Sequence, residues 1–207
     1  MGTVKSLLLG MCFVLGACTS QTSTVQTTEK GTQWEWQNGT IVVKTPERPE
    51  GQKSVLGLTT PKLEAVRVGF VGLGMRGPGA VERFTYIPGT QVVALCDYEE
   101  ARADKCQELL KKASMPKAAV YSGDKGYEEL CKRDDIDLVY IAADWLHHFP
   151  VAKCALENGK NVAIEVPSAM NLQECWDLIN LSESTRKHCF ILENCCYDWF
   201  EMNTLNI

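Results

Sequence analysis

The sequence predicts an α/β fold, with a parallel sheet covered by helices on both faces. Short apolar runs rich in Val and Ile alternate with longer stretches of helical periodicity. The first run, Val66–Val71, leads directly into a glycine-rich turn at Gly72–Gly77, and the second, Gln91–Cys96, ends at the acidic Asp97. Strands that alternate with helices in this way form a doubly wound parallel sheet with right-handed crossovers.

The glycine-rich turn has the spacing G-x-G-x-x-G between a strand and a helix, which is typical of a Rossmann dinucleotide-binding domain. Gly72 makes the tight turn, Gly74 lets the backbone approach a pyrophosphate, and Gly77 lets helix and strand pack closely. Asp97 is placed to accept hydrogen bonds from an adenosine ribose and would repel a 2′-phosphate, so NAD is favoured over NADP. The alternative is a glycine-rich turn followed by an Asp that caps a helix.

Further strands and helices continue the alternation. Pro150 is expected near the first turn of one helix and Gly159 just past its end, and Asn171 with Glu174 resembles a capping box that opens the next. The remaining strands are expected at 118–121, 137–142, 161–164 and 188–193, and the first two helices after Asp97 at 99–113 and 127–132. The expected buried faces are Cys106, Leu109, Leu110 and Ala113, and later Leu172, Cys175, Trp176 and Ile179.

The N-terminus resembles a bacterial lipoprotein signal. Lys5 precedes an apolar run, Leu7–Gly16, that is too short to span a bilayer as a stable helix. Leu15-Gly16-Ala17-Cys18 resembles a lipobox, which implies cleavage before Cys18 and lipidation of its thiol. We therefore expect residues 1–17 to be a signal peptide and the exported protein to be held by its lipid at the periplasmic face or the cell surface. A plain secretory signal is the alternative.

Two segments between this signal and the first strand are expected to lie outside the main fold. Residues 18–33 are mostly Thr, Ser and Gln, which predicts a flexible tether. Residues 34–65 are broken by Pro46 and Pro49, and we interpret them as an extended arm lying on the main domain. The NAD-binding domain itself is expected to cover residues 66–197.

Composition narrows the classes of function. The chain has 207 residues, 45% hydrophobic and 23% charged, which is typical of a globular protein. Its net charge of −5 does not indicate the excess of basic residues that is typical of nucleic-acid-binding proteins. The spacing of its ten cysteines matches no C-x-x-C metal pattern, so we expect no metal site. Most of them lie at apolar positions of the expected elements, which favours small buried side chains over disulfides.

The residues after the sixth strand suggest an incomplete protein. Residues 198–207 include Trp199, Phe200, Met202, Leu205 and Ile207. We interpret them as the start of a second α/β domain that is missing after Ile207, since a dinucleotide-binding domain rarely has a substrate site of its own. The alternative is a long C-terminal helix on a complete single-domain protein.

Candidate ligand contacts follow the strands, because ligands of an open parallel sheet bind outside the carboxyl ends of its strands. After the fourth strand, Trp145 can lie against a ring of the cofactor and His148 can reach a phosphate or ribose. After the fifth and sixth strands, Glu165 would bond a hydroxyl or amide, and Asn194 would face a carboxamide or ribose. The alternatives are a packed Trp with a solvated His, and loop residues that bond their own backbone.

The strand and turn at 66–77, Asp97 and the segments after strands four and five resemble the Gfo/Idh/MocA oxidoreductase family. The resemblance covers about Val66 to Ile207 and implies a second domain with an open antiparallel sheet and much of the substrate site. The usual family motif after the fifth strand is Glu-Lys-Pro, whose Lys serves proton transfer. Here it is Glu165-Val166-Pro167, and a valine cannot carry a proton, so an ordinary sugar dehydrogenase is disfavoured.

With this departure, the sequence resembles glycoside hydrolase family 109. The likeness includes Met75-Arg76, Trp145 with His148, the run Glu193–Tyr197 and the arm at 48–58. Position 147 is His, where relatives often carry a bulky aromatic residue. The resemblance implies NAD contacts from Met75, Arg76, Asp97, Trp145, His148, Glu165, Val166 and Asn194.

The same resemblance implies a hydrolase that removes terminal α-linked N-acetylgalactosamine from a glycan and uses NAD without net redox change. Hydride leaves C3, the C2 proton is lost, the leaving group is expelled, water adds and hydride returns. The catalytic Tyr and His are expected beyond Ile207, so this chain alone is not expected to cleave a glycoside. The alternatives are a sugar oxidoreductase of the same fold and a non-catalytic NAD-binding remnant. The oligomeric state, including a homo-oligomer, stays open.

Overall fold

A computed structural model describes residues 26–27, 33–43 and 47–204 of the chain. The chain divides into two compact units, Met1–Lys44 and Thr45–Ile207. The expected signal peptide and Cys18 lie outside the described residues. Within the described ranges, no helix is long and apolar enough to cross a membrane.

The first unit contains a small antiparallel sheet with the strand order β1-β2-β3. Strands β2 (Gln33–Gln37) and β3 (Thr40–Val43) form a hairpin, and β1 (Gln26–Thr27) pairs with β2. Asn38 and Gly39 make the turn with positive φ angles of 50° and 80°, as two-residue hairpin turns require.

The hairpin corrects two expectations from the sequence. An extended arm does not begin at residue 34, and the flexible tether does not include residues 26–27, which form β1. The physical reason is the Asn-Gly pair between two strand-forming runs, which is a strong local signal for a hairpin.

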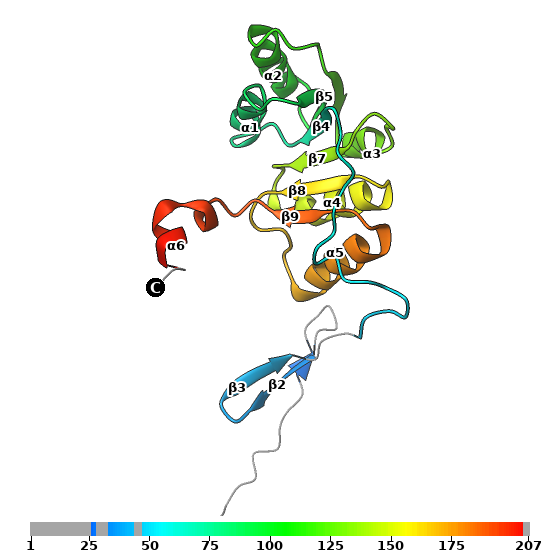
Figure 1. The fold of residues 1–207 in the computed structure, drawn as a ribbon, viewed down its shortest axis with the longest axis vertical. Helices are drawn as coiled ribbons and strands as arrows, with labels where there is room; N and C mark the ends of the chain where they lie inside the picture. Colours follow the sequence, from blue (N-terminus) through cyan, green and yellow to red (C-terminus); the bar gives the residue numbers. More distant parts are fainter. Residues whose placement is uncertain (1–25, 28–32, 44–46, 205–207) are drawn as a thin grey trace, which may run out of the picture. The chain divides into compact units, whose positions relative to one another are not determined.

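The second unit is built on a six-stranded parallel sheet, which confirms the predicted doubly wound fold (Figure 1). The order β6-β5-β4-β7-β8-β9 places the strand before the glycine-rich turn between β5 and β7. The winding therefore reverses at β4, and the strand ends beside it form the edge where such sheets bind ligands. The strands are β4 (Val66–Val71), β5 (Thr90–Asp97), β6 (Ala119–Ser122), β7 (Leu138–Ile141), β8 (Asn161–Ile164) and β9 (Cys189–Ile191).

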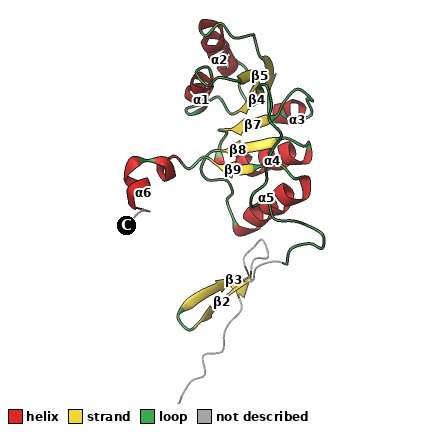
Figure 2. Cartoon of the chain, in the orientation of Figure 1, coloured by secondary structure: helices red, strands yellow, loops and turns green. Residues whose placement is uncertain are grey.

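Helices cover both faces of this sheet (Figure 2). Helices α1 and α2 pack on one face, and α3, α4 and α5 pack on the other. A 3₁₀ turn, η1, and a short helix, α6, follow the last strand. The helices are α1 (Gly77–Phe84), α2 (Ala101–Lys112), α3 (Gly126–Cys131), α4 (Trp145–Glu157), α5 (Leu172–Thr185) and α6 (Trp199–Thr204), and η1 is Asn194–Tyr197.

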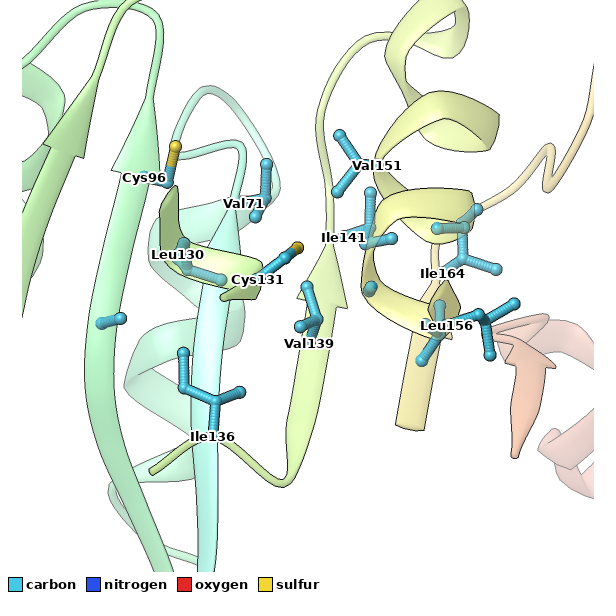
Figure 3. Close-up of a cluster of buried hydrophobic side chains, with 14 of the residues drawn as sticks. Val71, Cys96, Leu130, Cys131, Ile136, Val139, Ile141, Val151, Leu156 and Ile164 are labelled. Carbon is cyan, nitrogen blue, oxygen red and sulfur yellow. The ribbon is translucent and has the colours of Figure 1, made fainter. Parts of the chain in front are cut away.

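Each face of the sheet has its own buried core. Figure 3 shows the core under α3 and α4, where Val139 and Ile141 of β7 lie close to Leu130 and Leu156 of the helices. Burying a side chain of this size stabilises the fold by about 1.5–3 kcal/mol relative to leaving it exposed. The two cores therefore fix the strands, and with them the strand ends that carry the candidate site residues.

Helix α4 begins earlier than expected. Asp144 is its N-cap, and the Asp144 side chain accepts a hydrogen bond from the N–H of Leu146 at 3.0 Å. Pro150 consequently lies inside the helix and not near its first turn. The expected cap at the start of α5 is present, because Asn171 accepts a bond from the N–H of Glu174 at 3.1 Å. The carboxylate of Glu174 reaches back to the N–H of Met170, at 2.8 Å, one residue before the N-cap.

The predicted buried face is wrong in α5 and holds in α2 except at its last residue. In α5, Leu172, Cys175 and Ile179 are exposed, whereas Leu178 and Ser182 are buried. The predicted residues do form an apolar stripe on α5, but the helix packs on the main domain through the neighbouring stripe that contains Leu178. In α2, Cys106 and Leu110 are buried as expected, but Ala113 is the exposed C-cap residue. The expectation that most cysteines are small buried side chains also holds only in part, since Cys175, Cys195 and Cys196 are exposed.

The arm is fixed to α5 through side-chain contacts. The Arg48 guanidinium donates two hydrogen bonds to the carboxylate of Glu183, at 2.8 and 2.9 Å. Gln52 bonds the same carboxylate at 3.0 Å, and Arg186 donates to the carbonyl oxygen of Lys53 at 2.7 Å. Glu183 is buried beneath these groups. This part of the arm lies on the main domain, as the sequence predicted.

Candidate cofactor site

A cavity of about 790 Å³ opens at the carboxyl ends of the central strands. Its wall combines the turn after β4, the end of β5, the start of α4, the segment after β8 and the start of η1. The fold thereby brings to one cavity every residue that the sequence proposed as a cofactor contact. These are Gly72, Gly74, Met75, Arg76, Asp97, Trp145, His148, Glu165, Val166 and Asn194.

The three glycines of the turn have different structural requirements. Gly72 has a φ of +92°, and an added Cβ would lie 2.3 Å from the main-chain nitrogen of Ala143. A Cβ on Gly77 would lie 2.1 Å from the carbonyl oxygen of Gly72. A Cβ on Gly74 would meet only the Arg102 side chain, at 3.6 Å. Gly72 and Gly77 are therefore required for backbone packing, whereas Gly74 keeps the cavity side of the turn open.

The start of α1 is suited to an anion. No side chain caps the helix at Arg76, so its first main-chain N–H groups are not occupied by a capping oxygen. The positive end of the helix dipole adds to their attraction for a phosphate. The turn and the helix start together form a phosphate-binding element.

Asp97 connects the end of β5 to this turn. Its Oδ2 accepts a hydrogen bond from the N–H of Leu73 at 2.6 Å, and its Oδ1 accepts bonds from the N–H of Glu99 at 3.0 Å and from Arg102 at 3.3 Å. The carboxylate is buried and holds the turn in place. A carboxylate has about four acceptor positions, so capacity remains for a ribose hydroxyl. Arg102 lines the same cavity and was not identified from the sequence.

The start of α4 presents Trp145 at the cavity. The indole is 60% exposed, so its face is accessible to a flat ring. His147 also lines the cavity, and Oδ2 of Asp144 lies 2.6 Å from its Nδ1. Burial alone would raise the pKa of Asp144, but its hydrogen bond and charge interaction with His147 hold that pKa below its usual value.

His148 has a different environment from the one expected. It is buried, with Nδ1 at 2.7 Å from the carbonyl oxygen of Pro167 and Nε2 at 2.9 Å from that of Ala143. Both ring nitrogens face main-chain oxygens, so the expectation that His148 reaches a phosphate or ribose does not match its position. The ring instead links the segment after β7 to the segment after β8.

Glu165 also has an internal partner. Its Oε1 accepts a hydrogen bond from the hydroxyl of Tyr140 at 2.8 Å, and both side chains are buried. Burial, together with the bond to Glu165, raises the pKa of Tyr140 to about 12. Sequence analysis missed Tyr140, although a tyrosine in a buried strand needs a partner for its hydroxyl.

The remaining candidates lie at the exposed rim of the cavity. Met75 is 95% exposed, and Arg76, Val166 and Asn194 are exposed as well. Asn194 is the first residue of η1, which begins just after β9. These side chains are accessible to a ligand that extends across the cavity.

The arrangement fits a dinucleotide. The phosphate-binding turn lies between Asp97 and Arg102 on the β5 side and Trp145 and Glu165 on the β7 and β8 side. Cavities of roughly 300–1,000 Å³ are usual for organic ligands, and this one falls within that range. Within the described part of the chain, no group of three or more His, Cys, Asp or Glu side chains is arranged to hold a metal ion.

Comparison with known proteins agrees with this geometry. Residues 66–192 match the Gfo/Idh/MocA family model, described as an oxidoreductase family with an NAD-binding Rossmann fold. Over its whole length the chain is 80% identical to glycosyl hydrolase family 109 protein 4 of Phocaeicola vulgatus. Over 99% of its length it is 57% identical to glycosyl hydrolase family 109 protein 1 of Bacteroides thetaiotaomicron. The chain spans 40% of the first of these proteins and 43% of the second.

Solved structures share the fold. A myo-inositol dehydrogenase from Lactobacillus casei, in complex with NAD(H) and myo-inositol, matches with a TM-score of 0.57 and 23% identity, over 68% of this chain and 42% of that one. A 3-ketoreductase from Actinomadura kijaniata with bound NADP matches with a TM-score of 0.59 and 21% identity, over 69% of this chain and 43% of that one. These likenesses show the shared fold, and the family model supports the NAD predicted from the glycine-rich turn.

Proposed function

Because the chain belongs to the Gfo/Idh/MocA oxidoreductase family, with its NAD-binding Rossmann fold, we propose that it carries the NAD-binding part of a family 109 glycosidase. The proposed reaction removes terminal α-linked N-acetylgalactosamine with no net oxidation or reduction. Bound NAD would take a hydride from C3 of the sugar and return it at the end of the cycle. Since the chain spans 40% of a relative that is 80% identical to it, we place the sugar-binding groups outside it.

The observation that carries this proposal is Val166. This residue lies at the cavity, exposed at its rim, between Glu165 and Pro167. In the Glu-Lys-Pro pattern of the family's sugar dehydrogenases, the lysine takes up or supplies the hydroxyl proton, and the proposed glycosidase must also remove this proton from O3 when C3 is oxidised. A valine at this position cannot do so. The high identity to family 109 proteins supports the same conclusion independently.

The residues of this chain would bind and orient the dinucleotide. The turn at Gly72–Gly77 and the start of α1 would hold the pyrophosphate, and Asp97 would receive a hydroxyl of the adenosine ribose. Trp145 and Asn194 would contact the nicotinamide half. Val166 would give that half an apolar neighbour that takes no part in proton transfer. The groups that accept the O3 proton during oxidation and return it at the end, that move the C2 proton and that protonate the leaving oxygen would then all come from outside this chain.

A sugar oxidoreductase is the second candidate, supported by the family model and by the fold shared with a myo-inositol dehydrogenase. The two candidates differ in the fate of the hydride. An oxidoreductase releases an oxidised sugar and accumulates NADH, whereas the proposed glycosidase returns the hydride to the same sugar.

The test uses the full-length protein, NAD⁺ and an aryl α-N-acetylgalactosaminide. We expect release of the aryl alcohol and of N-acetylgalactosamine, while the NADH absorbance stays at its starting level over many turnovers. NADH that rises in proportion to consumed sugar would support the oxidoreductase instead. If neither product forms although NAD⁺ binds, the glycosidase proposal fails for this substrate.

A further inference from the structure

An array of three polar side chains from three elements lies behind the cavity wall. The Arg83 side chain of α1 acts on Tyr140 of β7 and opposes the rise in the pKa of Tyr140 that burial causes. The Tyr140 hydroxyl donates to Oε1 of Glu165, just after β8, at 2.8 Å. Tyr140 and Glu165 are 6% and 7% exposed. Only Glu165 of the three lines the cavity, so any effect of Tyr140 on a ligand must pass through Glu165.

The Tyr140 ring is held rigidly on the sheet. It stacks on Phe70, with ring centroids 5.0 Å apart and an interplanar angle of 29°, and it meets Phe84 edge-on at 5.7 Å and 83°. Aromatic contacts of this kind stabilise by about 0.5–1.5 kcal/mol each beyond their buried area. With the ring fixed between β4 and α1, its hydroxyl has a defined position relative to the strand ends.

The Glu165 carboxylate depends on this hydroxyl for its orientation. A buried carboxylate is costly unless it is hydrogen-bonded. Tyr140 satisfies Oε1, and no described residue bonds Oε2. The side chain, which lines the cavity, therefore has one oxygen fixed to the protein and a second one with no hydrogen-bond partner among the described residues.

Topology indicates which half of the dinucleotide this oxygen would meet. In a doubly wound sheet, each half of the fold binds one mononucleotide, and the pyrophosphate lies at the reversal between them. Asp97 follows β5, on the adenosine side of β4, and Glu165 follows β8, on the opposite side. Glu165 is therefore placed at the nicotinamide half.

We propose that Tyr140 is a positioning residue, whose hydroxyl fixes Glu165 so that Oε2 accepts a hydrogen bond from the nicotinamide nucleotide. The inference rests on NAD binding in this cavity and does not depend on glycosidase chemistry. Arg83 supports the array by its positive charge near Tyr140, which lowers the pKa of Tyr140 against the effect of burial.

The test compares NAD⁺ with ADP, which lacks the nicotinamide half. In the Tyr140→Phe variant of the chain, we expect the dissociation constant for NAD⁺ to rise by roughly tenfold, as for the loss of one hydrogen bond to a charged group, and that for ADP to stay within about twofold of the unaltered chain. Tyr121→Phe is the matched control, because its hydroxyl bonds Arg133 away from the cavity. Both dissociation constants should be unchanged in that control.

A double-mutant cycle separates positioning from general structural damage. If Tyr140 acts through Glu165, the Tyr140→Phe change should have no further effect on NAD⁺ affinity once Glu165→Gln is present. Thermal unfolding of each variant shows how much of any effect comes from stability. Equal weakening of ADP and NAD⁺, or an effect of Tyr140→Phe that persists in Glu165→Gln, would overturn the proposal. So would a lack of NAD⁺ binding by the unaltered chain, whereas failure to cleave a glycoside would overturn only the proposed function.

Discussion

The carboxylate of Asp97 accepts a hydrogen bond from the main-chain N–H of Leu73 at 2.6 Å. Beside this contact, the N–H of Gly72 donates to the carbonyl oxygen of Cys96 at 2.9 Å. These bonds tie the end of β5 to the glycine-rich turn after β4. Asp97 therefore shapes the phosphate-binding turn, in addition to the ribose contact that we propose for it.

Replacing Asp97 by Asn should weaken both the fold and NAD⁺ binding. An amide can accept the bond from Leu73, but its NH₂ group would then face the N–H of Glu99, which now donates to Oδ1. We expect a loss of about 1–3 kcal/mol in the free energy of unfolding and at least roughly tenfold weaker NAD⁺ binding. Calorimetric titration and thermal unfolding measure these effects, and Asp104→Asn, an exposed change on α2, is the control. Unchanged NAD⁺ affinity in Asp97→Asn would contradict this role.

The close approach of α1 to the turn predicts that Gly77→Ala is damaging. The added Cβ would lie 2.1 Å from the carbonyl oxygen of Gly72, so the turn must shift and NAD⁺ binding should be lost or reduced by roughly 100-fold, which corresponds to about 2.7 kcal/mol. Gly79→Ala lies on the same helix and meets only a flexible arginine, at 3.6 Å, so it should bind NAD⁺ like the unaltered chain. Equal affinities of the two variants would refute this account of the turn.

The ion pair between Arg67 and Asp137 predicts an acid-sensitive part of the stability. Asp137 accepts bonds from the Arg67 side chain at 2.8 and 2.9 Å and from its N–H at 2.9 Å. Hydrogen bonding to Arg67 lowers the pKa of Asp137, although burial opposes it. Because the folded pKa is the lower one, this stabilisation is complete above the unfolded value of about 3.9 and is lost as pH falls through the folded value.

Asp137→Asn should therefore be less stable than the unaltered chain at pH 7, and the difference should shrink in acid. Urea unfolding midpoints at pH 7 and at about pH 3 provide the measurement. Asp134→Asn, an exposed change three residues earlier in the chain, is the control. A difference that stays constant between the two pH values would show that the ion pair is not the cause.

The contact between Arg48 and Glu183 predicts that the arm can be released selectively. Hydrogen bonds from Arg48 and Gln52 lower the pKa of Glu183, so the contact should persist through neutral pH and weaken only in acid. Arg48→Gln should make the arm more sensitive to limited proteolysis without weakening NAD⁺ binding. Lys62→Gln is an exposed control. An arm that is cut at the same rate in both variants would contradict the proposed attachment.

The lipobox-like run before Cys18 predicts covalent lipidation. In the native host, the protein should incorporate labelled palmitate and fractionate with membranes, and Cys18→Ser should abolish both properties. Cys12→Ser, inside the expected signal peptide, should leave them unchanged. A soluble, unlabelled protein with an intact Cys18 would favour a plain secretory signal.

Local patterns predicted much of the fold and the position of the site. The spacing of Gly72, Gly74 and Gly77 is fixed by backbone sterics within a few residues, and hydrophobic periodicity placed each strand of the main sheet within about two residues of its observed ends. Because the topology of a parallel sheet gathers its carboxyl ends, the candidate residues line one cavity.

Features that depend on tertiary contacts were not predictable in this way. The exposed stripe on α5 resembles a buried one in periodicity, and only its packing through Leu178 shows the difference. His148 and Glu165 could be placed near the cavity, but their partners, Pro167 and Tyr140, are defined by the folded chain. The hairpin at Asn38-Gly39 was also missed, but it does not depend on tertiary contacts. Its signal, an Asn-Gly pair between two strand-forming runs, is local in the sequence.

The most direct measurement for the proposed function is cleavage of an α-N-acetylgalactosaminide by the full-length protein in D₂O, followed by analysis of hydrogen isotopes at C2 of the released sugar. Removal of the C2 proton and later addition of water should place solvent deuterium at C2 of the product, with no accumulation of NADH. Hydrolysis by two carboxylates leaves the C2 hydrogen in place. Product with protium at C2 would therefore contradict the account.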